Sequence, residues 1–139
     1  MAIPAGFKLL QRQSPFNQLV GPIYSRGEGV DRVVGLLAEN KHCNSRGSVH
    51  GGLLATLADL ALGHTMAFLS EPPRSAVTAS LTIDYVGSAK ADDWLEVHTD
   101  VQKGSGRLMF ANCYVHVGET RIVRASAVFA GSGERRPGV

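Results

Sequence analysis

The stretch HGGLLATLADLALGHTMAFL, residues 50–69, decides the fold of this chain. From Leu53 onward, apolar residues occupy every side of a helical projection, which predicts a helix enclosed by the rest of the protein. Asp59 interrupts it, and an ionised carboxylate in apolar surroundings costs several kcal/mol unless a partner compensates it. Because such carboxylates are typical of catalytic sites or close pairs, Asp59 is the first candidate functional residue.

The composition is that of an ordinary globular protein. With 139 residues, of which 44% are apolar and 19% charged, the chain predicts one domain over residues 1–139, neither disordered nor repetitive. The net charge of +2, from 14 basic and 12 acidic side chains, does not indicate nucleic-acid binding. Cys43 and Cys113 lack the spacing of a disulfide framework, so we expect free thiols in a reducing compartment.

Two segments of the sequence bear on the location of the protein. Residues 1–10 contain Pro4 and Gly6 and lack the apolar core of a signal peptide. The run over residues 53–69 is short for a bilayer span and is interrupted by Asp59 and His64. We therefore expect a cytoplasmic protein without membrane contact.

Short elements are predicted on the N-terminal side of the helix. Ser14 is a favourable N-cap, Pro15 suits the first helical position, and Gly21 ends the helix that these residues predict. Gly27 and Gly29 mark a turn between two extended segments. The predicted elements are a helix over residues 14–20, two strands or a hairpin over residues 23–26 and 30–39, and a polar loop over residues 40–48.

After Pro72 and Pro73, which end the helical region, the sequence period changes to two. Four segments alternate apolar and polar residues, which predicts half-buried strands, with Thr78 and Trp94 on polar faces. Short connections at residues 104–106 and 118–120 predict antiparallel hairpins. The residues expected to face the core are Val77, Ala79, Leu81, Ile83 and Tyr85; Leu95, Val97, Thr99 and Val101; Met109, Ala111, Cys113, Val115 and Val117; and Val123, Ala125, Ala127 and Phe129.

One buried helix with five or six antiparallel strands predicts an α+β fold in which the sheet wraps around the helix. A strand, the long central helix and then four strands is the order of the hotdog fold. The segment Asn44-Ser-Arg-Gly-Ser-Val-His50-Gly51-Gly52, followed by Asp59, resembles the active-site pattern of the hotdog-fold acyl-CoA thioesterases of the PaaI-like, phenylacetate-degradation group. LTIDYVGSAK, residues 81–90, resembles a second landmark of that group, and the resemblance extends over residues 16–131.

The resemblance implies a role for each matching residue. The Gly51 N–H would stabilise the oxyanion, Asn44 would help to hold the substrate or the leaving thiolate, and Asp59 would activate water or attack directly. Thr78 matches a hydroxyl position that helps to place the attacking water. Elementary chemistry agrees at Gly51, because the first N–H of a helix has no intrahelical acceptor and lies at the positive end of the helix dipole.

Each of these residues also has a purely structural interpretation. Asp59 could cap a neighbouring loop, and Thr78 could be an ordinary strand threonine. His50 and Gly52 are assigned to substrate binding, yet His50 could simply hold the loop by a hydrogen bond at the helix entry. Gly51 and Gly52 could serve close packing of the helix on the sheet.

The spacing of the two main candidates predicts a dimer. Gly51 and Asp59 are eight residues apart, which is about 12 Å along one helix. Reacting groups must approach within about 3.5 Å, so both can act on one thioester only if they come from different subunits. The resemblance implies the same, because the family builds its sites across a dimer interface and often forms dimers of dimers.

The remaining candidates concern ligands. Lys103 and Arg107 flank a Gly-Ser-Gly turn and either form a solvated hairpin tip or contact the phosphates of coenzyme A. The other histidines show no metal-ligand spacing, so we expect no metal, and a carboxylate with an oxyanion donor requires no cofactor. These histidines are His42, His64, His98 and His116.

The sequence thus predicts an acyl-CoA thioesterase that releases a free acid and coenzyme A. The resemblance implies an aryl-acetyl or other aromatic acyl group, with medium-chain acyl groups as the alternative. A hydratase or dehydratase is a competing interpretation, but its differently spaced histidine–acid motif is not found. A binding protein that senses acyl-CoA without turnover is the second, against which Asp59 argues.

Overall fold

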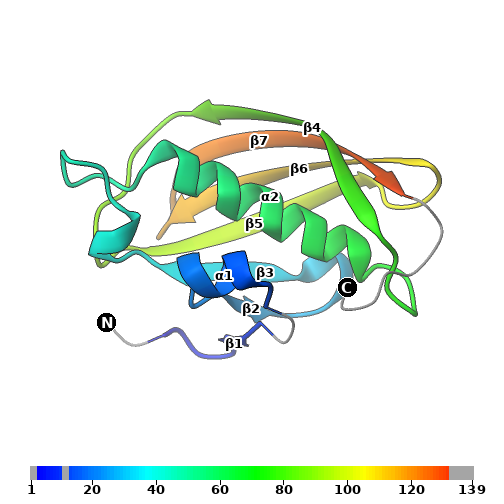
Figure 1. Cartoon of the computed structure of the whole chain (residues 1–139), viewed down its shortest axis with the longest axis horizontal. Helices are drawn as coiled ribbons and strands as arrows, with labels where there is room; N and C mark the ends of the chain where they lie inside the picture. Colours follow the sequence, from blue (N-terminus) through cyan, green and yellow to red (C-terminus); the bar gives the residue numbers. More distant parts are fainter. Residues whose placement is uncertain (1–2, 11–12, 132–139) are drawn as a thin grey trace.

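In the computed structural model, which describes residues 3–10 and 13–131, a curved sheet wraps around one long helix (Figure 1). This arrangement confirms the predicted α+β hotdog fold. The elements are β1 (Lys8–Leu9), α1 (Pro15–Val20), β2 (Tyr24–Arg26), β3 (Val33–Leu37), α2 (Gly51–Ala67), β4 (Ala76–Tyr85), β5 (Trp94–Lys103), β6 (Leu108–Val117) and β7 (Thr120–Gly131), with 3-10 turns at Gly29–Asp31 and Asn40–His42.

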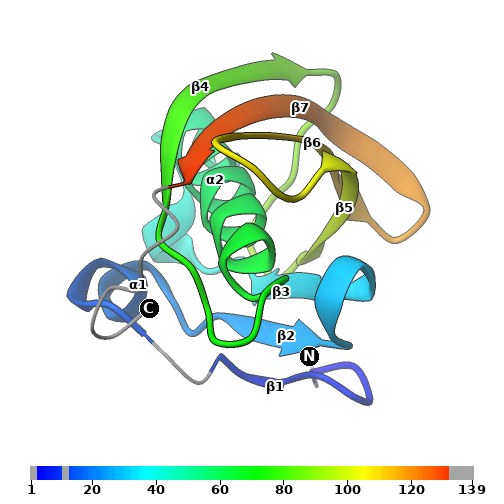
Figure 2. The ribbon, with the colours of Figure 1, turned by 90° about the vertical axis from the view of Figure 1, so that its right-hand side faces the viewer.

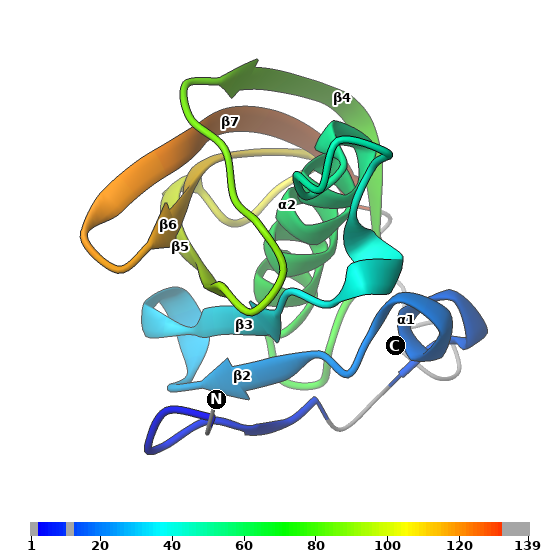
Figure 3. The same cartoon turned by 90° about the vertical axis from the view of Figure 1, so that its left-hand side faces the viewer.

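The seven strands form one sheet in the order β1-β2-β3-β5-β6-β7-β4, and every neighbouring pair is antiparallel. The predicted hairpins β5–β6 and β6–β7 are confirmed, whereas β4 crosses over to pair with β7 at the edge of the sheet. Figures 2 and 3, which view the molecule from its two ends, show the strands curving around α2. The sheet leaves one side of α2 uncovered, and α1 lies next to that side.

The core lies between the concave face of the sheet and one side of α2. The buried residues of α2 are Leu54, Leu57, Ala58, Ala61, Leu62, Thr65, Met66 and Ala67. The other side of the helix is half-exposed, so the prediction of a helix enclosed all round is wrong for the single chain. Within the described residues, no helix combines the length and apolarity needed to cross a membrane.

The N-terminal elements differ in part from the prediction. Helix α1 is confirmed: Ser14 Oγ accepts from the Asn17 N–H at 3.1 Å, and the Gly21 N–H donates to the Asn17 carbonyl at 2.7 Å. The strand predicted over residues 30–39 is shorter, because residues 29–31 form a 3-10 turn. The two-residue strand β1 has no periodic pattern that could have revealed it.

A β-bulge in β4 changes which residues face the helix. Thr78 pairs with Phe129 and Ser80 with Val128, so Ala79 is the extra residue. Paired residues share a face of the sheet, and Phe129 is buried against α2. Thr78 therefore faces α2, not the polar side that alternation predicted, and Val77 is 55% exposed.

The predicted outward position of Trp94 is correct, but the residue is buried. Its ring packs edge-on against Phe7 at 5.0 Å between centroids and lies 5.9 Å from the ring of Tyr24. It covers Gly35 on the neighbouring strand β3, where any Cβ would overlap its six-membered ring. Side chains from the N-terminal segment, β2 and β5 thus form a second, smaller apolar cluster on the outer face of the sheet.

We predict that Gly35→Ala destabilises the protein by about 3 kcal/mol, because the added methyl group must displace the Trp94 ring. Urea denaturation measures the loss. In a Trp94→Leu background the same substitution should cost much less, since the overlapping ring is gone. Equal costs in the two backgrounds would show that Trp94 is not the constraint.

Candidate active site

Asp59 and Thr78 form a hydrogen-bonded pair on the uncovered side of α2. Thr78 Oγ1 donates to Asp59 Oδ1 at 2.7 Å, a contact that depends on the bulge in β4. Within the described residues, Asp59 Oδ2 has no hydrogen-bond partner. Asp59 is half-buried rather than buried, because no part of this chain covers that side of the helix. One carboxylate oxygen is thus held in place while the other remains available.

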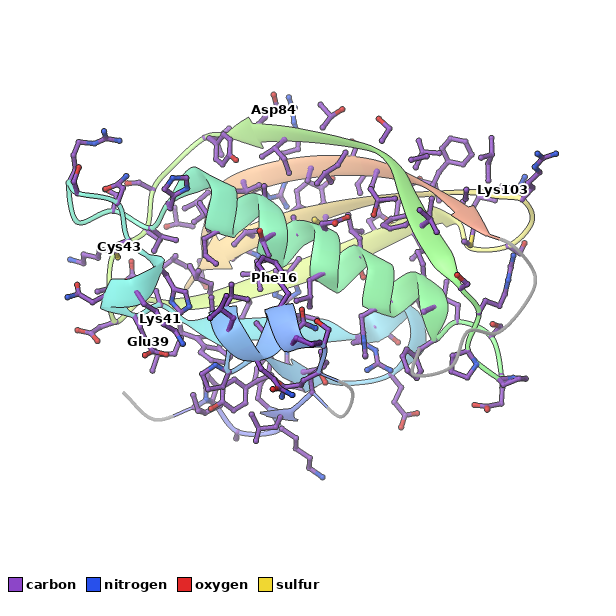
Figure 4. All side chains as sticks on the ribbon, in the orientation of Figure 1. Phe16, Glu39, Lys41, Cys43, Asp84 and Lys103 are labelled. Atoms are coloured by element: carbon purple, nitrogen blue, oxygen red, sulfur yellow. The ribbon has the colours of Figure 1, made fainter. Side chains whose placement is uncertain are left out.

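The pair opens into a cavity of about 340 Å³ between α1, α2 and the edge of the sheet. The cavity has several aromatic side chains in its lining, and Phe16, which Figure 4 labels, contributes to it from α1. It has enough room for an acyl group. Its lining residues are Phe16, Asn17, Thr56, Asp59, Leu60, Gly63, His64, Ala67, Phe68, Ser75, Ala76, Thr78 and Phe129.

The N-terminus of α2 presents one unused backbone donor. His50 is the N-cap, and its Nδ1 accepts from the Gly52 N–H at 2.8 Å, which is the positional role considered above. Within the described residues, the Gly51 N–H donates to no acceptor. Tyr85, which alternation predicts to face the core but which has no predicted role in the site, donates its hydroxyl to the Gly51 carbonyl at 2.7 Å. A Cβ at Gly51 would lie 3.3 Å from Tyr85 Cζ, so the glycine also serves close packing.

Asn44 shapes the loop that precedes α2. Its Oδ1 accepts from the N–H groups of Arg46 at 2.9 Å and Ser48 at 3.2 Å. The side-chain oxygen is therefore occupied within the loop, which leaves the Nδ2 donor for a ligand. Asn44, His50, Gly51 and Gly52 share this end of the helix.

A second cavity, of about 440 Å³, begins at this end of α2 and shares Thr56 with the first. It is lined by Leu19, Val20, Lys41, His42, Cys43, His50, Leu53 and Thr56. The two cavities together follow the uncovered side of α2 from His50 to Phe68. A ligand that is longer than an acyl group can therefore contact residues of both cavities along this side of the helix.

The two predicted phosphate-binding cations lie elsewhere. Lys103 and Arg107 are exposed at the β5–β6 connection, and Figure 4 shows Lys103 at the opposite end of the molecule from Cys43. The predicted site residues therefore lie in three separate places: the start of α2, the Asp59–Thr78 pair, and the β5–β6 hairpin. Within the described residues, no three His, Cys, Asp or Glu side chains gather as a metal site would require.

Comparison with known proteins identifies the family. The sequence profile of the Thioesterase superfamily matches residues 46–124, more than half of the chain. The chain belongs to the thioesterase superfamily. It is 48% identical to "Putative esterase PA0474" of Pseudomonas aeruginosa over 130 residues, which cover 93% of this chain and 97% of that protein. The protein is therefore a thioester hydrolase.

Solved structures agree with the fold of this thioesterase. The E. coli PaaI protein from the phenylacetic acid degradation operon superimposes with a TM-score of 0.79, at 18% identity, covering 88% of this chain and 87% of that one. The smu.793 protein of Streptococcus mutans UA159, bound to acetyl CoA, gives a TM-score of 0.73 at 19% identity, with coverages of 98% and 96%. These likenesses confirm the hotdog fold.

Burial and the charge of Asp59 both raise the pKa of a buried thiol in this thioesterase. Cys113 lies on β6 and is fully buried among the core residues. Burial raises the pKa of its thiol to about 12, and the negative charge of Asp59 adds to the increase. Cys113 is therefore protonated at neutral pH and cannot act as a nucleophile there.

We predict that iodoacetamide at pH 8 modifies Cys43 well before Cys113 in the native protein. With a pKa of about 12, only roughly one Cys113 in ten thousand is a thiolate at that pH, and the side chain is buried, whereas Cys43 is half-buried. Peptide mass spectrometry gives the two rates. In urea both thiols should react alike, and equal rates in the native protein would refute the prediction.

Proposed function

We propose that this thioesterase hydrolyses an acyl-CoA to the free acid and coenzyme A at a site shared between two subunits. The observation that carries the proposal is the position of two reactive groups on one helix: the unused Gly51 N–H at its start and the free Oδ2 of Asp59 eight residues later. Each is suited to one half of thioester hydrolysis.

The Gly51 N–H would stabilise the charge that develops on the thioester oxygen. It is the first donor of a 17-residue helix, lies at the positive end of the dipole, and has no side chain to obstruct a carbonyl. The His50 side chain already satisfies the next N–H, so Gly51 supplies the unoccupied one. The Tyr85 hydroxyl, bound to the Gly51 carbonyl, would hold this peptide in place.

Asp59 would either deprotonate the water molecule that attacks the carbonyl carbon, or attack that carbon directly and form an anhydride that water then hydrolyses to the free acid. The Thr78 hydroxyl orients the carboxylate through Oδ1, which leaves Oδ2 for the reaction. With water as the nucleophile, the C–O bond forms, the C–S bond breaks, and the water proton held by Asp59 can pass to the leaving thiolate. The Asn44 Nδ2 would donate to the substrate or to that thiolate. This chemistry uses no cofactor.

Two subunits are required by distance. Gly51 and Asp59 are about 12 Å apart along α2, too far to share one carbonyl. In an isologous dimer, Gly51 of one subunit would face Asp59 of the other, which creates two equal sites. The half-exposed side of α2, which carries Asp59, supports such an assembly because a partner could cover it. The proposal includes a dimer or a dimer of dimers.

The cavity next to Asp59 would receive the acyl group. Its aromatic lining suits an aryl-acetyl or other aromatic acyl group, and a medium-chain acyl group is the alternative. The likeness in fold to the acetyl-CoA-bound S. mutans protein and to the E. coli PaaI protein supports an acyl-CoA as the substrate, without indicating which acyl group. Lys103 and Arg107 remain candidates for the coenzyme A phosphates, while His50 and Gly52 would contact the substrate at the helix entry.

We predict that Asp59→Asn lowers thiol release from a panel of aryl and aliphatic acyl-CoAs by about a thousandfold, because the amide can neither accept a proton nor attack. Asp84→Asn is the matched control, since Asp84 is an exposed carboxylate paired with Arg124 at 3.0 Å on the outer face of β4. If the wild type binds acyl-CoA without turnover, the protein is a sensor instead.

We predict that inactive variants complement each other across the dimer. Gly51→Pro removes the N–H at the first helical position, where proline fits and the preceding His50 has compatible backbone angles of −60° and 133°. Gly51→Ala adds a Cβ at the same place but keeps the N–H, and is the control. Co-refolding Gly51→Pro with Asp59→Asn should restore about one quarter of wild-type activity, because half the dimers are mixed and contain one intact site.

No recovery in the mixture would place both groups in one chain and refute the shared site. Equal losses in Gly51→Pro and Gly51→Ala would show that the Cβ, rather than the missing N–H, abolishes activity. Native mass spectrometry confirms that mixed dimers have formed. Each outcome is thus tied to one group of the site.

A further inference from the structure

His64 lies in a wall that separates two cavities. It lines the cavity of Asp59, and together with Phe68 it also lines a third cavity, of about 440 Å³. Arg32 approaches this wall from the third cavity, next to strand β3. The proposed mechanism uses neither His64 nor Arg32, so their presence beside the acyl cavity needs its own explanation.

The contacts of His64 fix its tautomer. Its Nε2 lies 3.1 Å from Arg32 Nη1, and because a guanidinium can only donate, Nε2 must be the acceptor. The proton of the neutral ring is therefore on Nδ1. Burial, and then the charge of Arg32, lower the pKa of His64 to about 4, so the ring is neutral at neutral pH. Within the described residues, Nδ1 has no hydrogen-bond partner.

The ring of His64 is also held in place. It packs against the Phe68 ring at 4.6 Å between centroids, and the Arg32 guanidinium lies 5.5 Å from the centre of that same ring. The Nδ1–H is thus a pre-positioned donor rather than one end of a mobile side chain. Such donors are what a site needs to select a ligand by hydrogen bonding.

Arg32 adds a positive charge, without a contacting ion-pair partner among the described residues, behind this donor. Within the described residues it forms no ion pair, and its Nε is buried without a hydrogen-bond partner. Burial lowers the pKa of Arg32, and the exposed Glu28 counteracts this only through its charge. A half-buried cation of this kind is stabilised by a nearby anion. The pair therefore favours an acceptor that carries negative charge.

We propose that the His64 Nδ1–H, with the charge of Arg32 behind it, binds a carboxylate at the far end of the acyl group. This rests on the proposed function and narrows its substrates to acyl-CoAs that carry an anionic oxygen at that end. His64 follows Asp59 by five residues, which is about 7.5 Å along α2. In an extended chain each C–C bond advances about 1.25 Å, so the five bonds of a six-carbon chain span about 6.3 Å, and the hydrogen bond to Nδ1 covers the remaining distance. The Arg32 cation also offsets repulsion between the bound carboxylate and Asp59.

An anion at His64 has a second possible source, because the phosphates of coenzyme A share the same chemistry. The two sources differ in their dependence on the acyl group. Recognition of the acyl terminus changes the preference between two acyl-CoAs, whereas recognition of a phosphate changes the binding of every acyl-CoA and of free coenzyme A alike. The acyl source is favoured because His64 lines the same cavity as Asp59.

The test compares hexanedioyl-CoA with hexanoyl-CoA, which differ only in the terminal carboxylate. The wild type should show a kcat/KM about tenfold to a hundredfold higher for hexanedioyl-CoA, as expected for a hydrogen bond to a charged group. His64→Leu should abolish this preference, and His64→Gln, which retains a donor, should restore part of it. His116→Leu, on the outer face of β6, is the matched control and should leave the preference unchanged.

Three results would overturn the inference. A wild type that turns over both compounds without preference would leave the proposed function intact and reject only the role of His64. Equal increases in KM for both substrates and in the inhibition constant of free coenzyme A, caused by His64→Leu, would assign the anion to a phosphate. No thiol release from either compound by the wild type would overturn both proposals.

Discussion

The rigid spacing along α2 is the constraint on which the rest of the site depends. One side of the helix is packed against the concave face of the sheet, so α2 cannot bend to bring Gly51 toward Asp59. The reactive groups stay about 12 Å apart in one chain. The side that carries Asp59 is open to solvent or to a partner. Under the proposed mechanism, the packing that stabilises the fold therefore makes activity depend on the formation of a dimer.

Strand β4 contacts both Gly51 and Asp59 of α2. Its Thr78 contacts Asp59 in the middle of α2, and its Tyr85 contacts Gly51 at the start of the helix. Alternation alone turns Tyr85 toward the helix, and the bulge at Ala79 brings Thr78 to the same face. As an edge strand paired only with β7, β4 is the part of the sheet whose displacement would affect both groups together.

Much of the fold could be predicted because it follows from local periodicity. The apolar run of α2, the proline break and the alternation in β5, β6 and β7 all appear where the sequence indicates them. Alternation alone misplaces Thr78, because a one-residue bulge changes no residue type, whereas the family resemblance assigns its hydroxyl to the site. The layer over Trp94 depends on pairing with the N-terminal segment, which is distant in sequence. The motif indicated the Gly51 and Asp59 positions, whereas the Tyr85–Gly51 hydrogen bond and the Arg32–His64 contact arise only from tertiary structure.

The outer layer around Trp94 has an optical consequence. Trp94 is the single tryptophan of the chain, and it is covered by Phe7 and Tyr24 on the face of the sheet opposite α2. Its fluorescence therefore reports on the docking of the N-terminal segment rather than on events beside Asp59. Detachment of that segment would expose the indole to water and shift its emission to longer wavelengths while the core around α2 stayed intact. Tryptophan emission would then report on the outer layer around Trp94, and the helical circular dichroism signal on the core around α2.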